Sequence, residues 1–326
     1  MPVVLRFRQA RGGPVLRSLI RRGVQEACDF WVLCAVPGLP SLLPWRWAWA
    51  CYRALSRAPV LLEDQVRSCA QVIERTLPGI DRMQVLRRLR MLRMLDFADL
   101  YLARRTPLSA APGGHFRVEG EWPAGPFVAV SFHYGNGMWM LRDLLRKGRR
   151  TAVIAAPFEP GDYKGRRVYF GYSRARHREM ERSAGHVAAY RPRVREKLMQ
   201  ALAEGHVVMS LLDLPPRLVP ANQQPVRLLD RPASLPAGVF QLAAAADVPV
   251  VPFWVELDAQ GMRTLMIGDA RDAHDTAGNL AWFAALLDSL IRRDPAAWYF
   301  WTEWPTWSPA AESAGEHAAP QATPSA

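Results

Sequence analysis

The sequence predicts an α/β protein with a mixed, mostly parallel sheet, flanking helices and a helical region at its N-terminus. Hydrophobic periodicity changes near residue 107, from steps of three and four residues to short runs of consecutive apolar residues. These apolar runs then alternate with helical patterns, which is the element order of parallel sheets. Half of the 326 residues are hydrophobic and 22% are charged, so the chain can bury a sizeable core.

The N-terminal region combines a basic arm with an apolar hairpin. Residues 1–22 contain six arginines and no acid. The apolar stretch 30–45 is interrupted by three prolines, so it is too short and too broken to cross about 30 Å of hydrocarbon as one helix. Trp45, Trp47 and Trp49 follow, and tryptophans are typical of the membrane–water interface. We expect this region to dock on an anionic membrane surface; the alternative is a helical cap over a soluble core.

The chain divides into three parts at changes of composition. A long helix is predicted from residue 83 to residue 102, where neither Gly nor Pro occurs, and a Pro- and Gly-rich linker follows. Residues 1–106 therefore form the N-terminal basic arm, interfacial hairpin and helices, and residues 107–308 form the α/β domain. Residues 309–326, rich in Ala, Pro and Ser, are expected to be a disordered tail.

The α/β domain shows four short apolar runs that predict buried strands. They span residues 127–131, 151–156, 206–212 and 248–255. Helical patterns lie between them, at residues 138–146, 192–204 and 236–246. Consecutive apolar residues, rather than strict alternation, are typical of strands that are buried on both faces of a parallel sheet.

The turn after the first predicted strand is the main candidate site. It places His133 before Gly135, Asn136 and Gly137, and a helix follows. Ligands bind at this edge of open α/β sheets. Histidine has a reference pKa near 6.5, so it accepts protons at neutral pH and can act as a general base. The glycines let a substrate approach the backbone, and a helix N-terminus can stabilise an oxyanion or a phosphate.

This turn and three later blocks carry a family resemblance. After the His-Tyr-Gly-Asn turn at 133–136 come a strand ending in Asp at 204–213, the Arg-Pro-Ala-Ser block at 231–238, and a tryptophan-rich ending at 292–301. In order and spacing they resemble the bacterial lipid A late acyltransferases, the lauroyl and myristoyl branch of the lysophospholipid acyltransferase superfamily. The resemblance covers about residues 15–308 and implies a lysophospholipid-acyltransferase-like fold.

The resemblance also implies an activity, partners and site residues. A membrane-associated enzyme would move a fatty acyl group from an acyl-carrier protein or CoA thioester to a hydroxyl or amine of a lipid or glycolipid, as in lipopolysaccharide biosynthesis. His133 would deprotonate the acceptor, and backbone amides at 135–137 would stabilise the oxyanion. Arg174, Arg176 and Arg178 stand where the family keeps basic residues near the acceptor. No metal or redox cofactor is expected, because a thioester is already activated. The expected location is the cytoplasmic face of the cell inner membrane.

The sequence departs from the family pattern at Met138, and less centrally at Leu214 and Asp230. The pattern has an acid five residues after the histidine, and here that residue is Met138. The next acid, Asp143, lies about 140° further around the predicted helix and faces elsewhere. Asp213 and Glu256, at or near predicted strand ends, are the candidates for a carboxylate supplied from across the sheet. The alternative hypothesis is a catalytically impaired pseudoenzyme that binds acyl groups or lipids.

Charge and cysteine content limit the possible partners. The net charge is +12, and residues 142–197 hold sixteen Lys or Arg against six acids. Such a segment suits a phosphorylated glycolipid and an acidic acyl-carrier protein. Nucleic acid is the competing partner, but no nucleic-acid-binding module is recognisable, so none is expected. The four cysteines show no CxxC spacing, which argues against a disulfide framework and a zinc ribbon.

Overall fold

The computed structural model describes residues 14–110, 114–135, 138–154, 160–185, 188–189 and 193–307. Within these ranges seven strands form one sheet. Its order is β1 (Phe116–Glu119), β9 (Arg263–Ile267), β8 (Val250–Leu257), β2 (Val128–Ser131), β5 (Val207–Leu211), β3 (Thr151–Ile154) and β4 (Ala188–Ala189). Neighbours are parallel except β8 and β9, which are antiparallel. The predicted α/β class with a mixed, mostly parallel sheet is confirmed.

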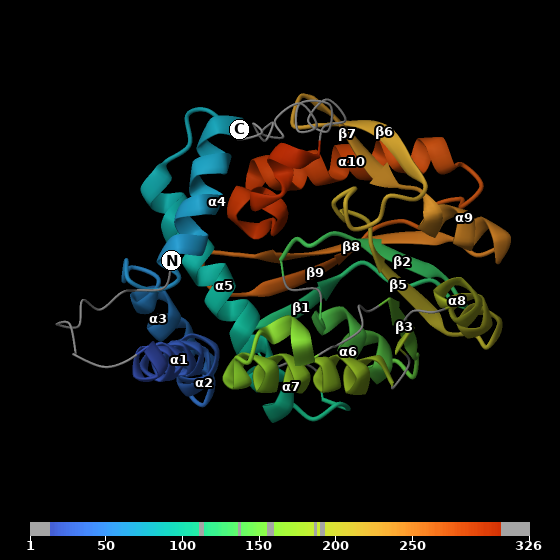
Figure 1. The fold of residues 1–326 in the computed structure, drawn as a ribbon. Helices are drawn as coiled ribbons and strands as arrows, with labels where there is room; N and C mark the ends of the chain where they lie inside the picture. The colour runs from blue at the N-terminus through green and yellow to red at the C-terminus, as the bar shows by residue number, and fades with distance from the viewer. Residues whose placement is uncertain are drawn as a thin grey trace, which may run out of the picture.

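Helices cover both faces of this sheet (Figure 1). On one face lie α9 (Gly238–Ala245), α10 (Thr276–Arg293) and a two-stranded hairpin of β6 (Gln223–Leu228) and β7 (Arg231–Pro236). The opposite face carries α6 (Met138–Arg146) and α7 (Arg167–Ala184), and α8 (Val194–Ala203) contacts β3 and β5. Short 3₁₀ turns span Pro160–Tyr163, Pro295–Ala297, Phe300–Thr302 and Trp304–Thr306. Because β2 has a parallel neighbour on each side and helices above and below, all four of its residues are buried.

The helix α5 (Arg82–Arg105) joins the N-terminal helices to the sheet. The carboxylate of Asp81 caps its start by accepting hydrogen bonds from the backbone N–H groups of Met83 and Gln84. No Gly or Pro interrupts the following 24 residues, in agreement with the predicted helix. Along its length α5 contacts α2 and α3 on one side and the segment after α10 on the other. Before it, α4 (Glu63–Thr76) packs along the same helix.

The N-terminal region is helical throughout its described part. It consists of α1 (Pro14–Phe30), a π-helical turn (Trp31–Ala35), α2 (Val36–Ser41) and α3 (Trp45–Leu55). Residues 1–13 of the expected basic arm, and the expected tail 309–326, lie outside the described residues.

The three neighbouring tryptophans do not share one environment. Trp49 is buried, and Trp45 stacks on it at a ring distance of 6.0 Å, whereas Trp47 is 56% exposed. The expectation that all three lie at a membrane interface is therefore wrong for Trp49, whereas Trp45 is partly buried and remains partly accessible. Among the described helices, none combines the length and the apolar character needed to cross a membrane.

Candidate active site

His133 and Asp213 meet at the carboxyl edge of the sheet. Their strands, β2 and β5, are parallel neighbours, and Ser131 lies level with Leu211. His133 and Asp213 each follow the end of their strand by two residues, so both lie at the same edge of the sheet. Nδ1 of His133 is 2.9 Å from Oδ1 of Asp213. The sequence placed both residues at strand ends, and the structure brings them into contact.

The carboxylate of Asp213 is fully buried and surrounded by donors. The backbone N–H of His133 donates to both of its oxygens at 2.8 Å. The indole Nε1–H of Trp298 donates to Oδ2 at 2.9 Å. A buried carboxylate is costly unless donors replace the water that it loses. These contacts satisfy both oxygens and fix the orientation of the carboxylate toward the imidazole.

Trp298 reaches Asp213 because its segment pairs with the turn that carries His133. The N–H of Tyr299 donates to the carbonyl of His133, and the N–H of Gly135 donates to the carbonyl of Ala297, each at 3.0 Å. From the sequence, Trp298 was expected only as part of the tryptophan-rich ending, and its contact with Asp213 was not predicted. One signal was available, since a buried tryptophan usually finds an acceptor for its N–H.

The contact with Asp213 decides which nitrogen of His133 is basic. Nδ1 faces a carboxylate and therefore carries the hydrogen, which leaves the lone pair on Nε2. The His133 side chain is 29% exposed, and the ring of Phe300 packs against it edge-on with a centroid distance of 4.6 Å. An oriented and partly accessible imidazole of this kind can accept a proton from a bound hydroxyl or amine.

Glu256, the second candidate acid, does not contact His133. It accepts a hydrogen bond from Nε1 of Trp254, two residues earlier on β8, at 2.8 Å. Its Oε1 instead forms an ion pair with Nη1 of Arg293 at 2.9 Å. Of the two acids that the sequence left open, the structure therefore places Asp213 at the imidazole.

The helix after the turn supplies no acid to His133. Met138 begins α6 and packs, partly buried, against the core. Asp143 is buried on the same helix, where it accepts from Trp122 Nε1 and pairs with Arg146 and Lys147, each at 2.9 Å. The expectation that Asp143 faces elsewhere is confirmed. The carboxylate that contacts His133 thus comes from the end of β5 and not from α6.

The turn itself needs a glycine at position 135. Gly135 has a φ of +62°, and a Cβ at this position would lie 2.2 Å from the carbonyl oxygen of Val255. A side chain is excluded both by the backbone conformation and by the contact with β8. Asn136 and Gly137, the other residues expected to stabilise an oxyanion, lie outside the described residues.

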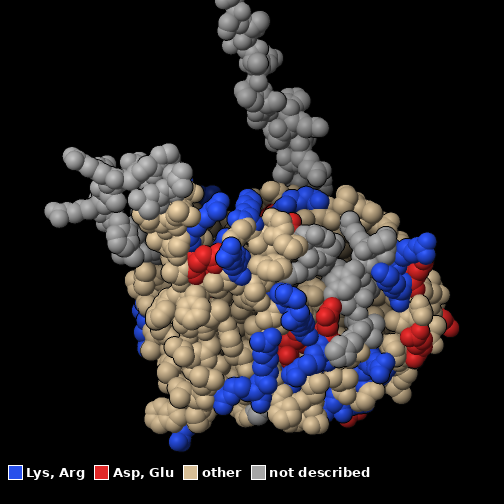
Figure 2. Space-filling view, turned by 60° about the horizontal axis from the view of Figure 1, so that its bottom comes forward, with Lys and Arg blue, Asp and Glu red and all other residues tan. Residues whose placement is uncertain are grey.

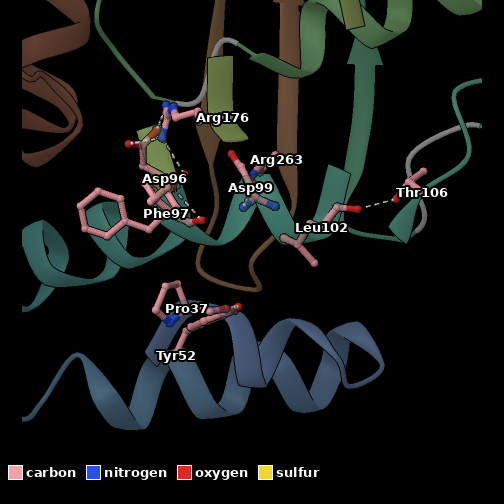
Figure 3. A network of polar contacts seen from close by, with 10 residues as sticks. Pro37, Tyr52, Asp96, Phe97, Asp99, Leu102, Thr106, Arg176 and Arg263 are labelled. Carbon is pink, nitrogen blue, oxygen red and sulfur yellow. Dashed lines mark hydrogen bonds and ion pairs between the residues drawn. The ribbon is translucent and has the colours of Figure 1, made fainter. Parts of the chain in front are cut away.

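The three arginines expected near the acceptor differ in their surroundings. Arg176 forms a bidentate ion pair with Asp96 of α5, at 2.9 Å and 2.6 Å, and Figure 3 shows the two side chains directed at each other. Arg176 therefore holds α7 against α5. Arg174 and Arg178 lie exposed on α7 and keep the surface position that binding to an anionic substrate requires.

Together, the fold and the site define an α/β protein with a carboxylate–histidine pair at the carboxyl edge of its sheet. No protein-family model matches the chain, and no curated protein matches it. Among the described residues, no group of three or more His, Cys, Asp or Glu is arranged to hold a metal ion.

Proposed function

We propose that this protein is an acyltransferase with a lysophospholipid-acyltransferase-like fold. It moves a fatty acyl group from an acyl-carrier protein or CoA thioester to a hydroxyl or amine of a lipid or glycolipid. The observation that carries the proposal is the 2.9 Å contact between Nδ1 of His133 and the buried carboxylate of Asp213. It supplies the acid that the sequence lacks at position 138.

The reaction uses His133 twice. Its Nε2 takes the proton of the acceptor as the acceptor oxygen or nitrogen attacks the thioester carbonyl, and the carbon–sulfur bond then breaks. The imidazolium returns the proton to the departing sulfur, so no proton is gained or lost overall. Asp213 stabilises the imidazolium during the step. Backbone N–H groups at positions 136 and 137 are left to stabilise the oxyanion, because the N–H of Gly135 already donates to the carbonyl of Ala297.

Attachment to a membrane is a second part of the proposal. Of the thirteen large apolar side chains that are exposed in the described residues, eight fall between residues 19 and 47. They are Leu19, Ile20, Phe30, Trp31, Leu39, Leu42, Leu43 and Trp47. An apolar patch of this extent marks an interaction surface. We infer peripheral docking on the cytoplasmic face of the cell inner membrane, since a cap over a soluble core would bury these side chains.

A basic surface lies next to this apolar region and suits acidic partners. In the view of Figure 2, Lys and Arg gather over the middle and right of the molecule. The area on the left, where α1 and α2 lie in Figure 1, carries few charges. Exposed arginines of α7, including Arg174 and Arg178, contribute to the basic surface. Guanidinium groups suit a phosphorylated acceptor and the acidic surface of an acyl-carrier protein.

The decisive experiment compares two histidine variants. Purified protein is incubated with labelled acyl-acyl carrier protein or acyl-CoA and a total lipid extract, and labelled lipids are identified by mass spectrometry. His133→Ala should abolish transfer while leaving the protein folded and its vesicle binding unchanged. His274→Ala, on an exposed side chain, is the matched control and should transfer normally. Absence of turnover by the wild type with either donor would favour the lipid-binding pseudoenzyme.

A further inference from the structure

Residues 294–299, the closing segment, follow α10 and carry several contacts of the candidate active site. Two backbone hydrogen bonds join the closing segment to the turn that carries His133. The indole N–H of Trp298 donates to the carboxylate of Asp213. Movement of the closing segment would therefore disturb the base and its carboxylate together.

The helix α5 holds the first residue of the closing segment through an arginine. Nε and Nη2 of Arg88 donate to the same carboxylate oxygen of Asp294, at 2.9 Å and 2.7 Å. Nη2 also donates to the carbonyl of Leu257 at the end of β8, at 2.6 Å. The side chains of Arg88 and Asp294 are only 26% and 21% exposed, so salt screens this ion pair less than one on the open surface. One guanidinium thus joins α5, β8 and the closing segment.

The carboxylate of Asp294 is not needed to form the local turn. Asp294 precedes the 3₁₀ turn Pro295–Ala297, but its side chain makes no capping hydrogen bond there. The turn is closed by the backbone instead, since the N–H of Ala297 donates to the carbonyl of Asp294 at 3.0 Å. The ion pair with Arg88 therefore attaches the closing segment to α5 without shaping the turn.

A second arginine of α5 holds the other end of the closing segment. The guanidinium carbon of Arg93 lies 3.8 Å from the centroid of the Tyr299 ring. Its Nη2 lies 3.5 Å from the carbonyl oxygen of Tyr299. A guanidinium over the face of an aromatic ring is attracted to that ring. The two arginines therefore fix both ends of the closing segment.

We propose that Arg88 and Arg93 are positioning residues of the proposed reaction. From α5 they hold the closing segment in place, and the segment keeps the carboxylate of Asp213 directed at His133. Neither arginine touches the substrate in this proposal. The inference rests on the proposed acyl transfer, but the attachment of the closing segment to α5 can be measured without turnover.

Hydrogen exchange of the Trp298 indole reports on the closing segment directly. Trp298 is fully buried, so its Nε1–H exchanges with solvent only when the segment opens or the whole protein unfolds. The protein is labelled with ¹⁵N-tryptophan, and the signal is identified by its loss in Trp298→Phe. Arg88→Gln removes a charge-assisted contact and should raise this exchange rate about fivefold or more. Trp139, fully buried on α6, is the internal reference and should exchange at the wild-type rate, because the whole protein stays folded.

Steady-state kinetics shows whether this opening matters for the reaction. Arg88→Gln should lower kcat about fivefold and leave the donor KM unchanged, because the arginine acts on the base and not on the substrate. A double-mutant cycle with Asp294→Asn isolates the pair, and the double variant should lose no more than Arg88→Gln alone. Arg93→Gln should also raise exchange and lower kcat, whereas Arg93→Lys keeps a cation over the ring and should restore most of both.

A matched control lies on the same helix. Nη1 of Arg82 pairs with Glu74 at 2.5 Å, but this ion pair joins α5 to α4 and not to the closing segment. Arg82→Gln makes the same chemical change and should leave Trp298 exchange and kcat unchanged. An equal effect of Arg82→Gln would attribute the result to the stability of α5 and overturn the specific role of the two arginines.

The outcomes separate the two proposals. Wild-type exchange and kcat in Arg88→Gln and Arg93→Gln would overturn the positioning role and leave the acyltransferase intact. A raised donor KM without faster exchange would make the arginines substrate contacts, which also overturns the positioning role. Faster exchange in the variants, with a wild type that transfers no acyl group, would keep the attachment of the closing segment and overturn the acyltransferase. An effect confined to one arginine would overturn the role of the other.

Discussion

The hydrogen bond from Trp298 to Asp213 offers the sharpest test of the site. Trp298→Phe keeps a ring in the same buried space but removes the N–H that donates to Oδ2 at 2.9 Å. Hydrogen bonds to a charged group contribute about 1.5–3 kcal/mol. The other donors to Asp213 described above are the backbone N–H and Nδ1 of His133. The variant therefore leaves the carboxylate held only by the histidine that it is meant to orient.

A second tryptophan provides a matched control. Trp304 is buried in the same cluster, with its ring centroid 5.9 Å from that of Trp298, but its Nε1 has no hydrogen-bond partner in the described structure. Trp304→Phe therefore removes the same volume without breaking a hydrogen bond. The difference between the two variants isolates the contact with Asp213.

Urea denaturation and steady-state kinetics measure the effect. Trp298→Phe should lose about 1.5–3 kcal/mol more stability than Trp304→Phe. If the lost hydrogen bond raises the activation free energy by about 1 kcal/mol, because Asp213 then stabilises the imidazolium less well, kcat falls about fivefold relative to the control and the donor KM stays unchanged. Equal stability and equal kcat in the two variants would refute the view that Trp298 orients the carboxylate.

Four further outcomes are expected. Asp213→Asn should lower kcat by about 10⁴-fold while Glu256→Gln lowers it by less than about twofold; the opposite ranking would move the orienting acid to β8. Met138→Glu should lower the rate of transfer, because the new carboxylate would repel that of Asp213. An increased rate would show that Asp213 does not orient the imidazole of His133. Burial and then Arg263 lower the pKa of His115 to about 3. The unfolded chain therefore binds the extra proton below about pH 6.5, so the unfolding free energy should fall from there toward pH 3. In His115→Phe the fall should be smaller, and a variant with the same pH dependence as the wild type would contradict this assignment. Trp31→Ser should weaken pelleting with anionic vesicles about tenfold, and high salt should release the wild type only partly, whereas complete release would exclude an inserted apolar surface.

The apolar pattern predicted the centre of the sheet better than its edges. β2, β3, β5 and β8 were expected because strands buried on both faces need consecutive apolar residues. The hairpin of β6 and β7 was missed, since β6 reads Gln-Gln-Pro-Val-Arg-Leu and is mostly exposed or half-buried. β1 and β9 carry arginines within short strands, so no apolar run marks them.

The sequence predicted the histidine and both candidate acids of the site, but not which of the two acids contacts the histidine. Both β5 and β8 flank β2, so strand order alone does not choose between Asp213 and Glu256. The choice depends on side-chain contacts in the folded chain, which join Asp213 to His133 and Glu256 to Arg293. Trp298 lies 85 residues from Asp213 in sequence, and only the folded chain brings it to the carboxylate.

The pairing of residues 133–135 with residues 297–299 has a consequence for how the protein is made. A ribosome adds about 5–20 residues per second, so roughly 8 to 33 seconds separate the synthesis of the histidine turn from that of the segment that closes over it. During this interval the N-terminal helices have already left the ribosome, whereas Asp213 still lacks its indole donor. The histidine–carboxylate pair is therefore complete only after residues 297–299 have been made, and under the proposed function a nascent chain would meet a lipid surface before it could act on it.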